Sequence, residues 1–257
     1  PQNLDDAISG GVGESPQRPD GALKVRGEYA YSSDLWAEDM LWGATLRSRH
    51  PYARIRSINS GEALKIPGVH AILTHEDVPG EPLYGLKVVD QPVLASDVVR
   101  YRGEPIALVA ADHPETARRA LERIVVDYEV LEPVTDAERA AHDDTLPRVH
   151  PDGNVVRHQR IVKGDPEAAA DVVVSGRYTV GMQDQAFLGP ESGLAIPAED
   201  GGVDLYLATQ DLHSDRAQTA RALGLPEDKV RMTLSGVGGA FGGREDLSMQ
   251  VHVCMLA

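Results

Sequence analysis

The chain has 257 residues and a formal net charge of −15, with 25 Lys and Arg against 40 Asp and Glu. This charge argues against a nucleic-acid partner, because phosphate contacts require clustered Lys and Arg. The single cysteine, Cys254, excludes an internal disulfide framework and an iron–sulfur cluster held by this chain alone, because such clusters generally take four thiolates. No apolar run approaches a membrane span of roughly 18 residues and no signal peptide opens the chain, so we expect a cytoplasmic protein without a membrane partner.

Residues 1–20 are rich in Gly, Pro, Asp and Gln and contain few branched apolar side chains. Such a composition has little to bury, and it predicts a flexible N-terminal arm.

Residues 21–145 show short strand-like runs interleaved with few helices, which predicts an α/β domain. A short helix is predicted at 60–64. A second helix is expected to begin at 112–114, because the apolar residues that follow fall on one helical face. Strands are predicted at 25–31, 41–47, 53–58, 69–73, 98–101, 105–111 and 125–130.

Residues 146–257 form the second predicted domain. Prolines and glycines interrupt both periodicities between about 140 and 163, which indicates an inter-domain connection. A mixed α/β, or α+β, fold follows for the whole chain. In this second part, a short helix is predicted at 163–169, a strand at 172–180, a strand pair at 193–197 and 203–209, a helix at 211–223 and a strand at 229–234.

The densest stretch of glycine lies at 236–243, where five of the residues are Gly. Glycine lets the backbone take positive φ and come close to a ligand, at a cost in conformational entropy. The dinucleotide fingerprint fails here because Phe241 stands where glycine is needed, and no Gly-Lys-Ser/Thr follows for a phosphate loop. The stretch therefore predicts a ligand-binding loop of another kind, with a tight turn between strand and helix as the alternative.

The sequence Gly-Gly-Ala-Phe-Gly-Gly-Arg-Glu at 238–245 resembles the Gly-Gly-x-Phe-Gly-Gly-Lys/Arg-Glu segment of the molybdenum hydroxylases. This family comprises the xanthine dehydrogenases and aldehyde oxidases, and the segment belongs to their molybdopterin-binding large subunit. Residues 181–188 resemble the family segment that carries a glutamine beside the metal, and residues 209–210 and 225–226 match the pattern between the two. The similarity runs from about Val25 to the end of the chain.

The resemblance implies a hammerhead-shaped α/β domain followed by the first, incomplete part of a molybdopterin-binding domain. It implies hydroxylation of an electron-poor carbon with oxygen from water, while two electrons pass to molybdenum. The implied cofactor is molybdenum-molybdopterin, with its cytosine dinucleotide form as an alternative, and the resemblance places 2Fe-2S clusters and FAD on partner chains or segments. The family's general-base glutamate falls beyond Ala257, so we expect a split subunit or a partial chain that is inactive without further chains.

Two candidate catalytic residues follow from the resemblance. Gln183 alone would be read as a polar residue at a strand end, but in the family this glutamine donates a hydrogen bond beside the metal without adding charge. Glu245 would face the substrate, with a place in the first turn of a following helix as the alternative. Phe241 would form a wall for a planar substrate. No residue is expected to bind the metal directly, and the candidate cofactor-binding residues are Gln183, Gly238, Gly239, Ala240, Phe241 and Gly242.

Glu245 also bears on the substrate. In the family, purine-hydroxylating relatives tend to carry Glu here, and a carboxylate can accept purine N–H bonds, so xanthine or hypoxanthine leads. Nicotinate, other N-heterocycles and aldehydes remain open, as does a non-catalytic assembly subunit. A hydrolase is a third possibility, since residues 213–215 are His, Ser and Asp, but adjacent residues cannot generally orient one another as a triad.

Overall fold

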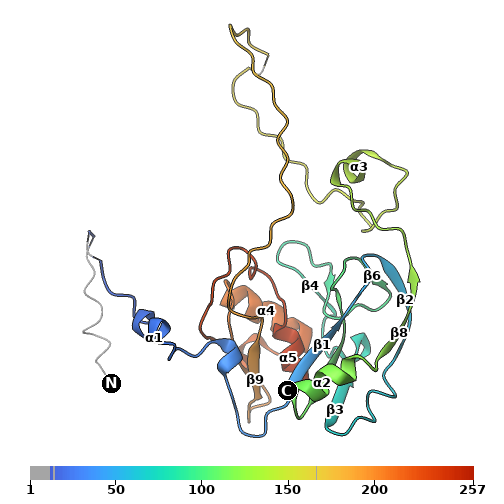
Figure 1. Ribbon diagram of the computed structural model, residues 1–257, viewed down its shortest axis with the longest axis vertical. Coiled ribbons are helices and arrows are strands. Elements are labelled where there is room, and N and C mark those ends of the chain that lie inside the picture. Colours follow the sequence, from blue (N-terminus) through green and yellow to red (C-terminus); the bar gives the residue numbers. More distant parts are fainter. Residues whose placement is uncertain (1–11, 14, 166) are drawn as a thin grey trace.

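The computed structural model describes residues 12–13, 15–165 and 167–257. The predicted arm at 1–20 therefore lies largely outside the described residues. The described part contains three three-stranded sheets and one two-stranded sheet, with helices packed against them (Figure 1). This mixed architecture agrees with the predicted fold class.

Strand β7 (Pro105–Ala111) is the centre of the first part of the chain. It lies between β1 (Trp42–Arg47) and β3 (Val69–Leu73), antiparallel to both, and all seven of its residues are buried. Helix α2 (Pro114–Leu121) covers one face of this sheet, and Pro114 in its first turn is compatible with a helix start. The buried residues of that layer are Ala63, Ala107, Val109, Ala111, Ala117, Ala120 and Ile124.

A second sheet packs beside the first. Its middle strand β2 (Ala53–Asn59) pairs antiparallel with β6 (Val98–Val99) and β8 (Val125–Val130). A small hairpin of β4 (Leu83–Tyr84) and β5 (Gln91–Pro92) leaves this body on the side of the C-terminal part.

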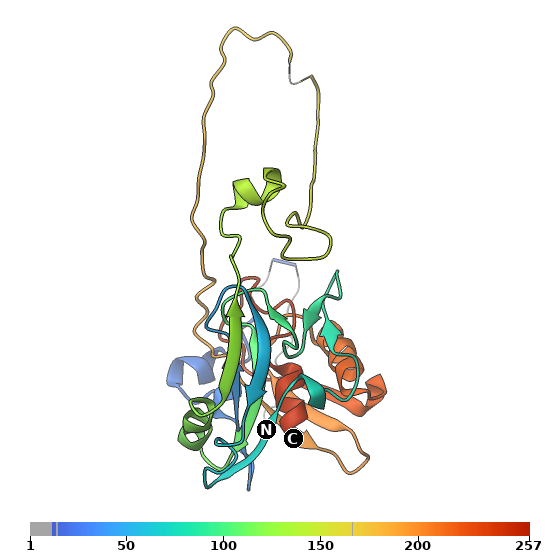
Figure 2. The same ribbon diagram turned by 90° about the vertical axis from the view of Figure 1, so that its right-hand side faces the viewer.

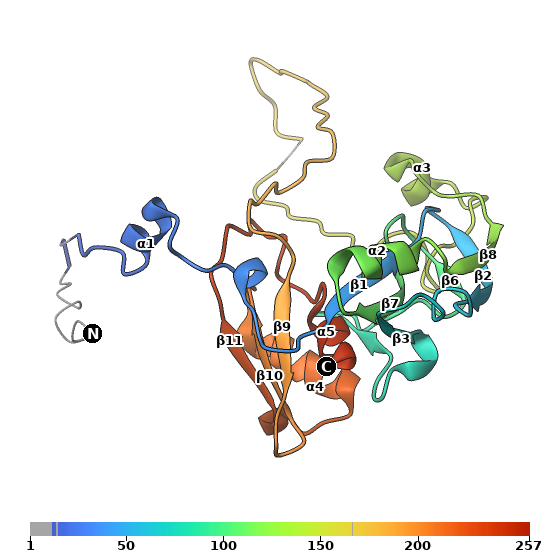
Figure 3. The same ribbon diagram turned by 60° about the horizontal axis from the view of Figure 1, so that its bottom comes forward.

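The C-terminal part is built on a third sheet (Figure 3). Strand β10 (Val203–Leu207) pairs antiparallel with β9 (Gly193–Pro197) and parallel with β11 (Val230–Leu234). Helix α4 (Leu212–Leu223) connects the two parallel strands, and α5 (Gln250–Leu256) packs against β9, β10 and α4.

The two parts share one core. Alternate residues of β7 face opposite sides, so Leu108 points away from α2 and joins residues of the C-terminal part. Burying this common surface stabilises the relative placement of the two parts. The buried members of the shared cluster are Tyr84, Val93, Leu94, Leu108, Ala222, Leu247 and Val251.

Residues 155–186, here called the extended segment, leave the body beyond α3 (Ala137–His142) and return to β9 (Figure 2). Every described residue of this segment is exposed, and none belongs to a helix or strand. The strand predicted at 172–180 is therefore wrong, and the helix predicted at 163–169 does not form in its described residues. β-branched residues favour a strand only where a neighbouring strand completes the hydrogen bonds and a face is buried.

Three other predictions differ from the structure. Residues 25–31 are not a strand, because α1 (Gly21–Arg26) runs into Gly27, which ends it at a φ of 71°. Residues 60–64 form turns without a helix, and the strand at 98–101 shortens to β6. Helix α5 has no side-chain cap on its N-terminal residue Met249 and was not predicted. Single 3-10 turns lie at Ser32–Asp34, His75–Asp77 and Glu227–Lys229.

Within the described ranges, none of the helices has the length and apolar character needed to cross a membrane.

Candidate functional site

The glycine-rich stretch follows the carboxyl end of β11, next to the carboxyl end of β10. The register pairs Leu207 with Leu234, the last residues of the two parallel strands. Gln210 lies just beyond one strand end, and residues 236–243 lie just beyond the other. Ligands of open α/β sheets bind outside the carboxyl ends of parallel strands, so the topology places this stretch where a ligand loop is expected.

Gln210 shapes the loop from the neighbouring strand end. Its Oε1 accepts hydrogen bonds from the backbone N–H groups of Gly242 and Arg244, both at 3.1 Å. Its own backbone N–H donates to the Arg244 carbonyl at 3.1 Å. The N–H of Gly242, expected to donate to a cofactor, therefore already has a partner in the protein.

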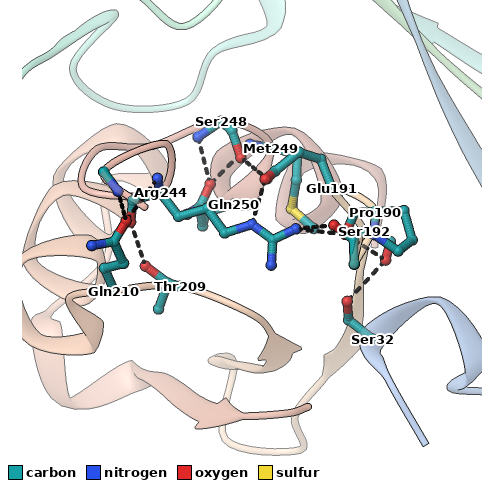
Figure 4. A network of polar contacts seen from close by, with 12 residues as sticks. Ser32, Pro190, Glu191, Ser192, Thr209, Gln210, Arg244, Ser248, Met249 and Gln250 are labelled. Atoms are coloured by element: carbon teal, nitrogen blue, oxygen red, sulfur yellow. Dashed lines mark hydrogen bonds and ion pairs between the residues drawn. The ribbon is translucent and has the colours of Figure 1, made fainter. Parts of the chain in front are cut away.

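Arg244 is the side chain that joins the loop to the segment before β9 (Figure 4). It is 2% exposed, and its Nε contacts Glu191 Oε1 at 2.6 Å. The guanidinium also donates to the carbonyls of Gly189 and Pro190, and it lies over the Phe187 ring at 4.3 Å. These contacts tie the two sequence motifs at 181–188 and 238–245 to one another.

Glu191 also contacts the residues just before α5. Its Oε2 accepts from Ser248 Oγ at 2.5 Å. Gln250 Oε1 then accepts from the N–H groups of Ser248 and Met249, at 2.7 and 2.8 Å. These bonds satisfy the N–H groups of the two residues just before α5, where Met249 offers no side-chain cap of its own.

Two of the loop glycines are needed for contact with the protein itself. A Cβ on Gly238 would lie 2.5 Å from the nitrogen of Gly189, and one on Gly243 would lie 2.7 Å from the Phe187 ring. The N–H of Gly189 donates to the Gly238 carbonyl at 3.3 Å. Part of the glycine pattern therefore serves the packing of the two motifs.

The turn between these glycines carries unused donors. Within the described chain, the N–H groups of Gly239, Ala240 and Phe241 have no hydrogen-bond partner. Phe241 has a φ of 52°, a backbone conformation that residues other than glycine rarely adopt, and it is 76% exposed. Consecutive free N–H groups in such a turn are suited to bind the anionic or oxygen-bearing groups of a ligand.

Glu245 follows this turn and is exposed. Among the residues that the structure describes, its carboxylate makes no hydrogen bond or ion pair, while Arg244 and Asp246 on either side are both engaged. Helix α5 begins only at Gln250, so the alternative place of Glu245 in a first helical turn is wrong.

Gln183 lies at the end of the extended segment and is not brought to the loop. It is exposed, and its Nε2 donates to the Gly181 carbonyl at 3.4 Å. Its neighbour Gln185 is closer, since a Cβ on Gly243 would lie 3.4 Å from the carboxamide carbon of Gln185. The contact between the motifs thus begins at residue 185 and continues to Glu191.

The residues at 213–215 form no catalytic triad. Asp211 caps α4 and accepts from Ser214 Oγ at 2.7 Å, while His213 is exposed. Asp215 is buried, accepts from Gln250 Nε2 at 2.9 Å, and its pKa is raised mainly by that burial. The described residues also contain no group of three or more side chains that could hold a metal ion.

Sequence reasoning assigned no role to Arg244, Glu191 or Gln210. Arg244 lies within the motif at 238–245. The feature that could have indicated its role is a positive charge placed between a pair of glycines and two acidic residues. Glu191 is 53 residues away from Arg244 in the sequence, and no motif around Glu191 predicts their contact.

Comparisons with known proteins agree with this arrangement. Residues 26–132 match the family described as aldehyde oxidase and xanthine dehydrogenase, a/b hammerhead domain. Residues 149–257 match the molybdopterin cofactor-binding domain.

Individual relatives are similarly consistent. The chain is 42% identical to a Bacillus subtilis (strain 168) protein named as a probable xanthine dehydrogenase subunit, over 93% of this chain and 32% of the relative. It is 36% identical to the nicotinate dehydrogenase large molybdopterin subunit of Eubacterium barkeri, over 95% of this chain and 58% of the relative. The aldehyde oxidoreductase structure from Desulfovibrio gigas superposes with a TM-score of 0.86 at 31% identity, over 93% of this chain and 28% of that one.

The chain thus spans between about a third and three fifths of the length of these two curated relatives. The two family matches follow one another in the order predicted from the sequence. The chain therefore belongs to the molybdenum hydroxylase family of xanthine dehydrogenases and aldehyde oxidases, with a hammerhead domain followed by a molybdopterin cofactor-binding region.

Proposed function

We propose that this chain provides the hammerhead domain and the first part of the molybdopterin site of an enzyme that hydroxylates a purine, with xanthine or hypoxanthine as substrate. Further chains or segments complete the site and hold 2Fe-2S clusters and FAD. The 42% identity to the Bacillus subtilis protein named as a probable xanthine dehydrogenase subunit supports the substrate class.

The residues of the loop fit the implied cofactor. The unpartnered N–H groups of Gly239, Ala240 and Phe241 are donors for its oxygen-bearing groups, and no acidic side chain of the described residues occupies them. When bound, the molybdenum-pterin group supplies two-electron redox chemistry, which protein side chains cannot provide. Gln183 would donate a hydrogen bond beside the metal once the extended segment is covered by its neighbours.

The exposed carboxylate of Glu245 carries the proposal for the substrate. Arg244 and Asp246 are bound to other parts of the protein, whereas Glu245 has free acceptors beside the turn with unused donors. A carboxylate at this place can accept N–H bonds from a purine, orient the ring and disfavour substrates that lack such donors. The exposed ring of Phe241 would lie against the planar substrate.

Nicotinate is a second candidate, because the nicotinate dehydrogenase relative is matched over 58% of its length. The two substrates would interact differently with Glu245. Nicotinate carries a carboxylate, which a neighbouring glutamate repels, whereas a purine offers N–H donors to it.

The test is Glu245→Val in the assembled enzyme. Loss of a hydrogen bond to a charged group costs about 1.5 to 3 kcal/mol, which corresponds to about ten- to more than a hundredfold in kcat/KM for xanthine. Turnover of an aromatic aldehyde, which lacks these N–H donors, should change less, and molybdenum content should persist because the loop is intact. We expect the ratio of kcat/KM for xanthine to that for the aldehyde to fall.

The outcomes separate the candidates. An unchanged ratio contradicts the role of Glu245 in recognition. A wild-type kcat/KM for nicotinate that exceeds that for xanthine would favour a pyridine carboxylate as the natural substrate class. Glu199→Val, at the exposed hairpin between β9 and β10, is the matched control and should leave all three rates unchanged.

A further inference from the structure

Asp246 links the glycine-rich loop to the hammerhead domain. Its Oδ2 accepts from Gln91 Nε2 at 3.0 Å and from the Leu86 N–H at 3.4 Å, both in the hairpin of β4 and β5. Its Oδ1 accepts from Gln218 Nε2 at 3.2 Å and from the Leu247 N–H at 2.9 Å, both in the C-terminal part. One carboxylate therefore holds two elements that are more than 120 residues apart in the chain.

Gln218 completes the link. It is buried in α4, and its Oε1 accepts from the Gly85 N–H at 2.9 Å. The side chain thus donates to Asp246 and accepts from the hairpin at the same time. The start of the hairpin is held independently, because the Gly80 N–H donates to the Ala222 carbonyl at 3.0 Å.

The contacts of Asp246 require a carboxylate. All four donors are neutral N–H groups, and within the described residues no cation lies within ion-pair distance of Asp246. An asparagine of the same shape would turn an NH2 group toward two of the donors and would lose their hydrogen bonds.

Among the described residues, Glu245 has no hydrogen bond or ion pair that would fix its side chain, so its position depends on its two neighbours. Arg244 holds it from the side of Glu191, and Asp246 holds it from the side of the hammerhead hairpin. We propose that Asp246 is a positioning residue, which couples the hairpin at 83–92 to Glu245 and thereby sets the selectivity of the substrate site. This inference rests on the proposed role of Glu245.

The first experiment measures backbone hydrogen exchange in the chain within its purified assembly. Asp246→Asn should accelerate exchange over residues 84–92, because the Leu86 N–H and the Gln91 side chain lose their acceptor. Adding Gln91→Glu should restore the protection around residue 91, since the amide of Asp246→Asn can donate to the new carboxylate, while the Leu86 N–H stays without this acceptor. Asp90→Asn removes a charge from the same hairpin, where Asp90 is exposed, and should leave exchange unchanged.

The second experiment measures selectivity in the same variants. Asp246→Asn should lower the ratio of kcat/KM for xanthine to that for an aromatic aldehyde by about three- to tenfold, chiefly through KM for xanthine, at unchanged molybdenum content. Gln91→Glu should recover the ratio. In a Glu245→Val background, Asp246→Asn should have no further effect on it, because the residue that it positions is gone.

The two experiments separate the possible failures. If Glu245→Val lowers the ratio but Asp246→Asn changes neither exchange nor ratio, the positioning role is wrong and the proposed function stands. If Asp246→Asn lowers the ratio equally in the wild-type background and in the Glu245→Val background, the positioning role is also wrong. If Glu245→Val leaves the ratio unchanged, the proposed function falls together with this inference, whatever the exchange data show of the hairpin.

Discussion

Strand β7 and the extended segment are both rich in small and β-branched residues, yet they differ completely in structure. Strand β7 is buried over its full length between β1 and β3. Val172, Val173 and Val174 in the extended segment are 78%, 79% and 88% exposed and pair with no strand of the described chain. The comparison shows that a neighbouring strand and a covered face decide strand formation here, while residue type contributes little by itself.

The sharpest test of this difference is a truncation in each region. Leu108→Ala in β7 removes a fully buried side chain from the shared core and should lower the free energy of unfolding by about 3 to 5 kcal/mol. Val174→Ala should change it by less than about 0.5 kcal/mol, because the side chain has little to lose. Urea denaturation of the isolated chain measures both. A large loss in Val174→Ala would mean that the extended segment is packed in solution.

Ion pairs in the packed body and in the extended segment provide a second test. Arg244→Met removes a buried guanidinium and leaves Glu191 and two carbonyls without their donor. We expect the free energy of unfolding to fall by about 3 kcal/mol. This is the lower end of the cost of breaking a buried ion pair, because the Glu191 side chain is 34% exposed and can be hydrated in part.

Arg177 in the extended segment is the matched control. It contacts Glu138 at 2.8 Å, but the two side chains are 82% and 72% exposed. Exposed pairs contribute little, so Arg177→Met should leave the unfolding midpoint within error. Equal effects of the two substitutions would contradict the account of Arg244 as the residue that joins the motifs.

The pH dependence of stability gives a smaller effect. His252 in α5 is buried, its Nε2 lies 2.8 Å from the Val93 carbonyl, and burial lowers its pKa from 6.5 to about 4. Because the folded protein disfavours the protonated ring, stability should fall as the pH drops from about 6.5 toward 4. At pH 5 this amounts to roughly 2 kcal/mol relative to neutral pH.

Glu104 and Asp215 oppose this trend, since burial raises the pKa of both carboxyl groups. The His252 contribution is therefore read as the difference between the wild type and His252→Gln in denaturation from pH 8 to pH 5. The variant should lose less stability over this range. His158→Gln in the extended segment, where the ring is exposed, should follow the wild type. If the free energy of unfolding depends on pH in the same way in His252→Gln and in the wild type, His252 is not held neutral by burial in the folded protein.

Much of the fold followed from local patterns in the sequence. Strands β1, β2, β3, β7 and β8, the pair of β9 with β10, and α4 were all predicted close to their observed bounds. Their signals are local, since the hydrophobic period lies within each element and, for α4, the capping Asp211 and the glycine Gly224 flank it directly.

The wrong strand at 172–180 and the missed helix α5 have another cause. The strand predicted at 172–180 needed a partner that its own sequence cannot specify, and α5 starts at hydrogen bonds made by Gln250. At the site, the motif at 238–245 was identified from sequence, but the contact of Arg244 with Glu191 and the link through Asp246 were not. Both depend on residues that only the folded chain brings together. The assignments of Gln183, Glu245 and the loop N–H groups to cofactor and substrate stay predictions.

The most direct test of the account is the molybdenum and pterin content of the purified assembly that contains this chain. We predict close to one molybdenum and one pterin per chain. We also predict loss of both in Gly238→Ala, because the added Cβ would lie 2.5 Å from the Gly189 nitrogen and would push the two motifs apart. Gly21→Ala, where the added Cβ would meet the Arg18 Cβ at an ordinary 3.6 Å, is the matched control and should leave both contents unchanged. An assembly that forms normally with wild-type chain but contains neither molybdenum nor pterin would contradict the account and leave a non-catalytic assembly subunit.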